Sequence, residues 1–88
     1  MLGLEWIPRI RMVLCRDGLN YRDLIMVAWA MGEESMGYET AVSAYADYMG
    51  CTPAYIHGSI RRWLREAGIR MAPADYLSWV VEEVCHAH

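Results

Sequence analysis

The sequence predicts an all-α fold: a compact single domain of five helices, spanning residues 1–88, that contains a helix-turn-helix. Three observations lead to this prediction. The chain has 88 residues, which suits one domain, and its hydrophobic content of 56% is sufficient for one core. Apolar residues recur at the three- and four-residue spacing of amphipathic helices. Glycine and proline fall singly between these periodic segments, and no internal repeat interrupts them.

The first two predicted helices cover about residues 4–16 and 21–31. Gly18 is expected to end the first helix. Asn20 is the expected N-cap of the second helix, and Gly32 is its expected end. The side chains expected to face the core are Leu4, Ile7, Ile10 and Leu14 in the first helix, and Leu24, Ile25, Ala28 and Met31 in the second.

Two further helices are predicted near residues 38–49 and 53–67, joined by the short turn Gly50-Cys51-Thr52. Thr52 is a favourable N-cap. Pro53 occupies the first helical position, where the missing N–H has no helical partner to lose. The side chains expected to face the core are Val42, Tyr45, Ala46 and Met49 in the earlier helix, and Ile56, Ile60, Trp63, Leu64 and Ala67 in the later one.

The last predicted helix covers roughly residues 74–85 and is opened by Pro73, after a short connector that begins at Gly68. Its expected core residues are Tyr76 or Leu77, Val80, Val81 and Val84.

The net charge of −3 is unevenly distributed. Residues 51–70 contain four arginines and one glutamate, a balance of +3, whereas the rest of the chain carries four arginines and ten acids, a balance of −6. The acidic total argues against a protein that coats nucleic acid generally. The positive balance of residues 51–70 is instead a local one.

The composition also excludes several classes of protein. The longest apolar run, Leu24 to Ala30 with Met31 after it, is far shorter than the roughly 20 residues that span a bilayer, so no membrane partner is expected. No secretion signal is visible, and we expect a cytoplasmic location. The three cysteines contain no C-x-x-C pair and are expected to be reduced thiols.

Neither a metal site nor an active site is predicted. The cluster Cys85-His86-x-His88 lacks the second upstream pair of a structural zinc site, so we expect no metal and no cofactor. The chain shows no glycine-rich phosphate loop and no recognisable pair of catalytic carboxylates, and its serines have no evident base. We therefore expect no enzymatic activity and no small-molecule substrate.

The helices at 38–49 and 53–67 have the spacing of a DNA-binding helix-turn-helix. An α-helix turns by about 100° per residue, and we take Ile56 to face the core. This geometry places one group of residues on the opposite side of the helix and two further residues at the edges of that side. The opposite group is Ala54, Gly58, Arg61 and Arg65, and the flanking residues are Tyr55 and Arg62. Arginine can bridge guanine acceptors or neutralise phosphate, and free N–H groups at a helix start favour phosphate.

The candidate DNA-binding residues are Thr52, Ala54, Tyr55, His57, Gly58, Arg61, Arg62 and Arg65. Arg61 is the best candidate for a base contact, and Arg62 and Arg65 are expected on phosphates. A simpler interpretation stays open, in which the arginines form an ordinary solvated helix face and His57 is a half-exposed residue at the helix edge.

The chain resembles the C-terminal DNA-binding (effector) domain of the sporulation initiation (stage 0 protein A) response regulators. The resemblance rests on three groups of residues: the segment from Gly18 to Ile25; Tyr45-Ala46-Asp47 with Thr52-Pro53, Ile56, Ile60-Arg61 and Ala67; and Ala72-Pro73-Ala74-Asp75-Tyr76-Leu77. It implies a transcription regulator that recognises short promoter elements in double-stranded DNA through the major groove, and that normally follows a phosphorylatable receiver domain. No receiver is present in this sequence.

The chain departs from that family on the candidate DNA face. Tyr55, His57 and Gly58 stand where the family carries Arg, Glu and Arg, and Arg61 is the residue that matches in kind. The family also has an additional helix before its last helix, whereas here Gly68–Pro73 is a short connector.

The sequence is therefore compatible with two functions. The first is sequence-selective DNA binding, with a homodimer on DNA as the compatible arrangement. The alternative is a protein-interaction module or antagonist on the same helical fold, which would use Tyr55, the edge of Trp63 and methionines as its contact surface.

Overall fold

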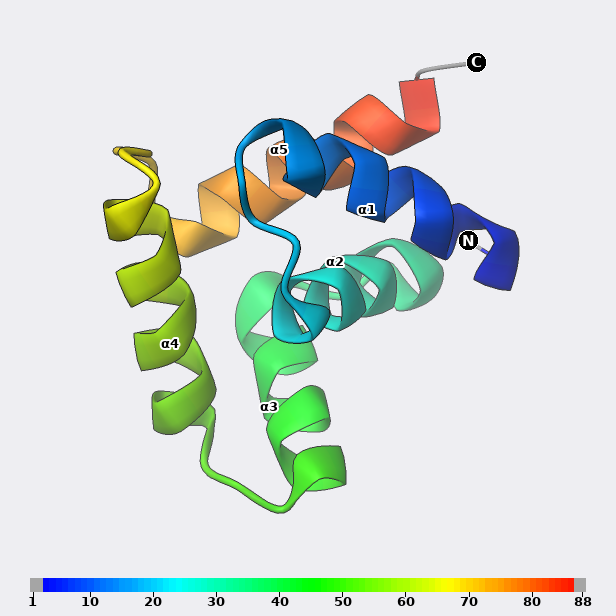
Figure 1. Ribbon diagram of the computed structural model, residues 1–88. Helices are drawn as coiled ribbons and strands as arrows, with labels where there is room; N and C mark the ends of the chain where they lie inside the picture. The colour runs from blue at the N-terminus through cyan, green and yellow to red at the C-terminus, as the bar shows by residue number, and fades with distance from the viewer. Residues whose placement is uncertain (1–2, 87–88) are drawn as a thin grey trace.

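Five α-helices and one short 3-10 helix form the described part of the chain, residues 3–86, in the computed structural model (Figure 1). In chain order they are η1 (Leu4–Trp6), α1 (Ile7–Arg16), α2 (Arg22–Glu34), α3 (Tyr38–Met49), α4 (Pro53–Glu66) and α5 (Pro73–His86). No strand occurs among these residues, and the prediction of an all-α fold is confirmed.

Helix α2 occupies the centre of the domain and packs against α1, α3 and α5. Helix α4 forms one flank, where it packs on α3 and α5 and touches α2 more lightly. Figure 1 shows α4 as the outermost helix on the left, with its far side turned to solvent. The radius of gyration is 11.8 Å, close to the roughly 12 Å expected of a folded domain of this length.

The core is built from the apolar stripes of all five helices. The side chains with at most 1% exposure include Ile10, Leu14, Leu19, Leu24, Val27, Ala28, Ala41, Ala46, Ile60, Leu77, Val80 and Val84. Burying one such leucine or isoleucine contributes about 1.5–3 kcal/mol. Most of the inward positions expected from the sequence are buried; Ile7, Trp63 and Val81 are half-buried.

Three expected core residues are exposed. Leu4 is 72% exposed because residues 4–6 form a 3-10 turn, whose tighter winding removes Leu4 from the apolar stripe of α1. Met49 is the last residue of α3 and is 46% exposed. Ala67 lies just past the end of α4, where the chain turns away from the core at Gly68, whose φ is +77°.

The ends of α2 differ from the prediction. The helix begins at Arg22 with Tyr21 as its N-cap residue, and no side chain caps it, so Asn20 is not the cap. It continues through Gly32 to Glu34 and ends at Ser35, which adopts a left-handed conformation with φ 51°. Glycine can adopt the backbone conformation that ends a helix, but it can also stay helical, as Gly32 does here.

The turn between α3 and α4 follows from three adjacent residues. Gly50 has a φ of +74°, which glycine adopts without strain, and the N–H of Cys51 donates to the carbonyl of Ala46 at 2.9 Å. Thr52 then caps α4, because its side-chain oxygen accepts the N–H of Tyr55 at 3.2 Å. These contacts fix where α4 begins relative to α3.

The observed bounds of α3 match the predicted range, and α4 stops one residue earlier than expected. Helix α5 is one residue longer at each end. Among the described residues, no helix is both long enough and apolar enough to cross a bilayer.

Candidate nucleic-acid interface

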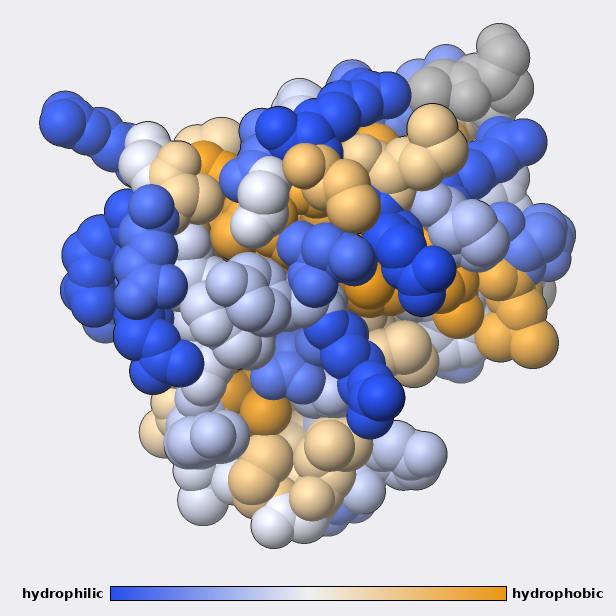
Figure 2. Space-filling view, in the orientation of Figure 1, coloured by the Kyte–Doolittle hydropathy of each residue, from blue (hydrophilic) through white to orange (hydrophobic). Residues whose placement is uncertain are grey.

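The solvent side of α4 carries the residues expected to face DNA. Ala54, Gly58, Arg61 and Arg65 are all exposed, as are the flanking Tyr55 and Arg62, and we call these six residues the arginine face. The opposite side of the helix is buried through Ile56, Ser59, Ile60 and Leu64. In Figure 2 strongly hydrophilic side chains cover α4 on the left of the molecule. The helix thus separates its core side from its solvent side as its sequence periodicity requires.

The three arginines of this face are available for a ligand. Within residues 3–86, no hydrogen bond, ion pair or ring contact engages the side chains of Arg61, Arg62 or Arg65. A guanidinium group carries five N–H donors in a planar fork that suits phosphate or the acceptors of guanine. The face therefore presents three unengaged cationic groups along a rigid helix.

The middle of the arginine face is nearly flat. Ala54 and Gly58 lie one turn apart, and a Cβ added to Gly58 would meet nothing within 4 Å in the described structure. Packing inside the domain therefore does not require glycine here. Glycine within a helix lowers stability by about 1 kcal/mol relative to alanine. The lack of side-chain volume leaves the backbone of α4 open to close approach by a partner.

Thr52 and Tyr55 lie at the start of α4. Both are exposed, but the hydroxyl of Thr52 is already used as the helix cap. The phenol of Tyr55 is 66% exposed and projects from the first turn of the helix. Tyr55 can therefore contact a partner with its ring or its hydroxyl, whereas Thr52 contributes mainly by ordering the helix start.

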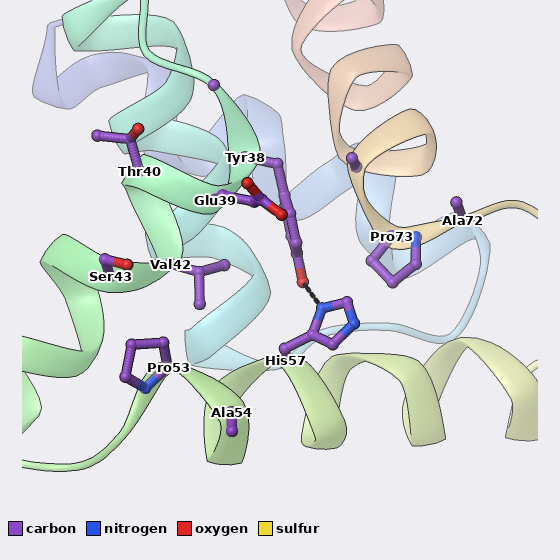
Figure 3. Close-up of a pocket in the computed structure, with 12 residues that line it drawn as sticks. Tyr38, Glu39, Thr40, Val42, Ser43, Pro53, Ala54, His57, Ala72 and Pro73 are labelled. Atoms are coloured by element: carbon purple, nitrogen blue, oxygen red, sulfur yellow. Dashed lines mark hydrogen bonds between the residues drawn. The ribbon is translucent and has the colours of Figure 1, made fainter.

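His57 does not join the arginine face. Its ring is half-buried and points toward the start of α3, where Nδ1 and the hydroxyl of Tyr38 share a hydrogen bond of 2.8 Å (Figure 3). The two rings meet edge to face with their centroids 5.7 Å apart. Burial raises the pKa of Tyr38 from 10.0 to about 12.

The Tyr38–His57 pair lies in an open hollow of about 720 Å³, where the first turns of α3, α4 and α5 converge. Besides this pair, its lining includes Glu39, Pro53 and Pro73, which Figure 3 labels. The sequence could not show this arrangement, because Tyr38 and His57 are 19 residues apart and meet only through the packing of α4 on α3.

A second aromatic contact joins α4 to the start of α2. The rings of Tyr21 and Trp63 stack with centroids 4.1 Å apart and planes within 3° of parallel. Tyr21 remains 38% exposed, so the stack forms part of the surface beside the arginine face. Sequence periodicity placed Trp63 inward but gave no indication of its partner, which lies far away along the chain.

Large apolar side chains are exposed around the α3–α4 turn. Tyr48 is 83% exposed near the end of α3, and Met49 follows it. Tyr55 lies on the other side of the turn in the first turn of α4. Tyr48 and Met49 thus add exposed apolar surface at the turn next to Tyr55 of the arginine face.

No group of three or more histidine, cysteine, aspartate or glutamate side chains that could hold a metal occurs in the part of the chain that the structure describes. Cys85 and His86 end α5, and His88 lies outside the described residues. Cys15, Cys51 and Cys85 are free thiols.

Comparisons of the chain with protein-family models, with curated proteins and with solved structures gave no significant match.

Proposed function

We propose that this domain binds double-stranded DNA selectively, with α4 in the major groove, and acts as a transcription regulator of the kind that its resemblance to sporulation effector domains implies. The observation that carries the proposal is the arginine face: three unengaged guanidinium groups and a flat centre on the exposed side of a rigid helix. The major groove of B-DNA is about 12 Å wide and admits an α-helix.

The positions on the arginine face suggest a division of roles. Arg61 lies one turn after His57 and close to the flat centre at Gly58, so a bidentate contact to guanine O6 and N7 is the role we assign to it. Arg62 and Arg65 lie at an edge and at the end of the helix, where contacts to phosphates are expected. Tyr55 would contact the backbone or a base edge from the first turn.

Binding as a homodimer is compatible with the size of the domain. Half-sites recognised by symmetric helix-turn-helix dimers are about 34–36 Å apart. The longest dimension of this domain is 35 Å, so two copies placed side by side fit that spacing.

The test is a fluorescence-anisotropy titration against a pool of short random duplexes at low and physiological salt, followed by sequencing of the retained DNA. We expect binding that weakens steeply with salt, because contacts to phosphates release counterions, and enrichment of a short motif. Enrichment should be lost in Arg61→Ala. If the protein binds no duplex even at low salt, the proposal is wrong.

The second candidate is a protein-interaction module. It is favoured by the exposed Tyr48, Met49 and Tyr55 beside the α3–α4 turn and by the acidic isoelectric point of 5.5. Salt dependence separates the two functions, since an apolar protein contact would not weaken steeply as salt is added.

A further inference from the structure

All eight arginines of the chain fall in two segments. Residues 9–22 contain four arginines and one aspartate, a balance of +3, which equals the balance of residues 51–70. The rest of the chain carries nine acids and no arginine or lysine, a balance of −9 that completes the total of −3. The positive charge therefore has two sources of equal size, and the arginine face accounts for only one of them.

The fold brings the two basic segments together. Tyr21 at the start of α2 stacks on Trp63 of α4, and the residues next to this pair are Arg22 and Arg62. Arg62 directly precedes Trp63 on α4 and is exposed. Figure 2 shows hydrophilic side chains not only over α4 but also over the start of α2 and over α1, on the same face of the molecule.

Between α1 and α2 lies a shallow hollow of about 380 Å³, which we call the arginine hollow. Its polar rim is formed by Arg11 from α1, Asn20 from the α1–α2 loop and Arg22 from α2, and its lining is completed by Ile7, Ile25 and Met26. Arg11, Asn20 and Arg22 are all exposed. No hydrogen bond or ion pair engages their side chains within residues 3–86.

The two acids nearest in sequence to the arginine hollow accept hydrogen bonds from tyrosines of other helices. Asp17 accepts a hydrogen bond of 2.7 Å from the hydroxyl of Tyr76 on α5. Asp23 accepts a short hydrogen bond from the hydroxyl of Tyr45 on α3. No ion pair joins Arg11 or Arg22 to either carboxylate within residues 3–86, and the Asn20 amide beside the two arginines can donate two hydrogen bonds.

We propose that Arg11, Asn20 and Arg22 bind the phosphate backbone of the duplex that α4 enters, next to the groove. This inference rests on the proposed function and extends the interface from one helix to three segments of the chain. Half to two-thirds of protein–DNA hydrogen bonds go to the backbone, and paired guanidinium and amide donors suit phosphate oxygens. These contacts carry no sequence information; they orient the domain so that α4 meets the base edges.

The experiment measures how the affinity for a fluorescein-labelled random-sequence duplex depends on salt between about 50 and 200 mM. The variants are Arg11→Gln and Arg22→Gln, with Arg16→Gln as the matched control. Arg16 is equally exposed on α1, but it borders a different hollow, with Met12 and Val84 on the side of α5. Circular-dichroism melts show whether each variant folds as the wild type does.

Each of Arg11→Gln and Arg22→Gln is expected to lower the slope of log K against log salt by about 0.9, the change for one lost phosphate contact. Both should weaken binding equally for every sequence, and Arg16→Gln should leave the slope unchanged. The inference is overturned if the two variants keep the wild-type slope, or if Arg16→Gln lowers it by the same amount.

A slope that falls in Arg65→Ala but not in Arg11→Gln or Arg22→Gln would remove the arginine hollow from the interface and leave the proposed role of α4 intact. Absence of wild-type binding at low salt would remove both proposals together.

Discussion

Tyr38, the first residue of α3, is tied to His57 in the second turn of α4 by a hydrogen bond of 2.8 Å between its hydroxyl and Nδ1 of the imidazole. The bond lies at the opposite end of α3 from the α3–α4 turn, so the two helices are joined at two separated points. This second connection adds to the core contacts of Ile56 and Ile60 in holding α4, and with it the arginine face, in its orientation.

Removing this hydrogen bond should destabilise the domain measurably. Tyr38→Phe is expected to lower the free energy of unfolding by about 1 kcal/mol, the net value of a typical hydrogen bond. The corresponding fall in Tm is about 4–8 °C for a domain of this size. Tyr48→Phe is the control, because Tyr48 is 83% exposed and its hydroxyl has no partner among the described residues. Equal effects of the two substitutions in thermal and urea denaturation would show that the bond contributes nothing.

Stability should fall at high pH. Burial raises the pKa of Tyr38 from 10.0 to about 12. Burial and hydrogen bonds to carboxylates raise the pKa values of Tyr45 and Tyr76 as well. The unfolded chain therefore loses these protons first as pH rises above 10.0, and the stabilisation present below that pH is lost progressively toward and beyond pH 12.

Urea denaturation midpoints across this pH range measure the effect. Tyr38→Phe should show a shallower decline than the wild type, since one of the three shifted groups is gone. The prediction would be contradicted if the urea midpoint of the wild type stayed constant as the pH rises through this range.

Alanine at two glycines should change stability in opposite directions. Gly58→Ala is expected to stabilise the fold by about 1 kcal/mol, because the added methyl group meets nothing and alanine favours a helix. Gly50→Ala should destabilise it by about 1 kcal/mol, because the φ of +74° at this position strains any residue with a Cβ. Urea denaturation gives both values.

The same Gly58→Ala protein tests close approach by DNA. If the backbone of α4 meets the bases at Gly58, the variant binds DNA more weakly while folding more stably. Unchanged affinity for the selected duplex would mean that no partner atom approaches this position.

Arg61 and Arg65 should differ in how they affect specificity. Arg61→Ala is expected to relax selection at a single base pair, with a loss of about 1–3 kcal/mol for the preferred base. Arg65→Ala should weaken binding to all duplexes alike and lower the salt slope by about 1. Affinities for the selected duplex and for single-base variants of it distinguish the two effects. Equal, sequence-independent losses from both would contradict the assigned roles.

Much of the fold could be predicted because its boundaries depend on local chemistry. The turn between α3 and α4 follows from Gly50 and from the Thr52 cap, both of which act within a few residues. The exposed side of α4 likewise follows from helical periodicity alone. The N-cap of α2 was predicted wrongly, because the preference for asparagine at a cap is a weak signal. Helix α2 begins after Tyr21, whose ring stacks on Trp63 of a distant helix.

The remaining features depend on how the helices pack. The partner of His57 is a tyrosine on another helix, and no sequence spacing predicts that pair. The arginine hollow combines residues of α1 and α2 that come together only when the loop between them closes. Counting the charge of residues 9–22 would have indicated a second basic segment, but not that it lies on the same side as α4.

The Tyr21–Trp63 stack sets the spacing between two helices. Two flat rings in face-to-face contact hold the start of α2 and the middle of α4 at a set separation, so the distance between the arginine hollow and the arginine face is decided before any partner arrives. A stiff ligand with regularly spaced charges can bind both surfaces without losing conformational entropy. A flexible chain must lose conformational entropy to bind in the same way. The domain should therefore prefer stiff duplexes to single strands of the same length and charge.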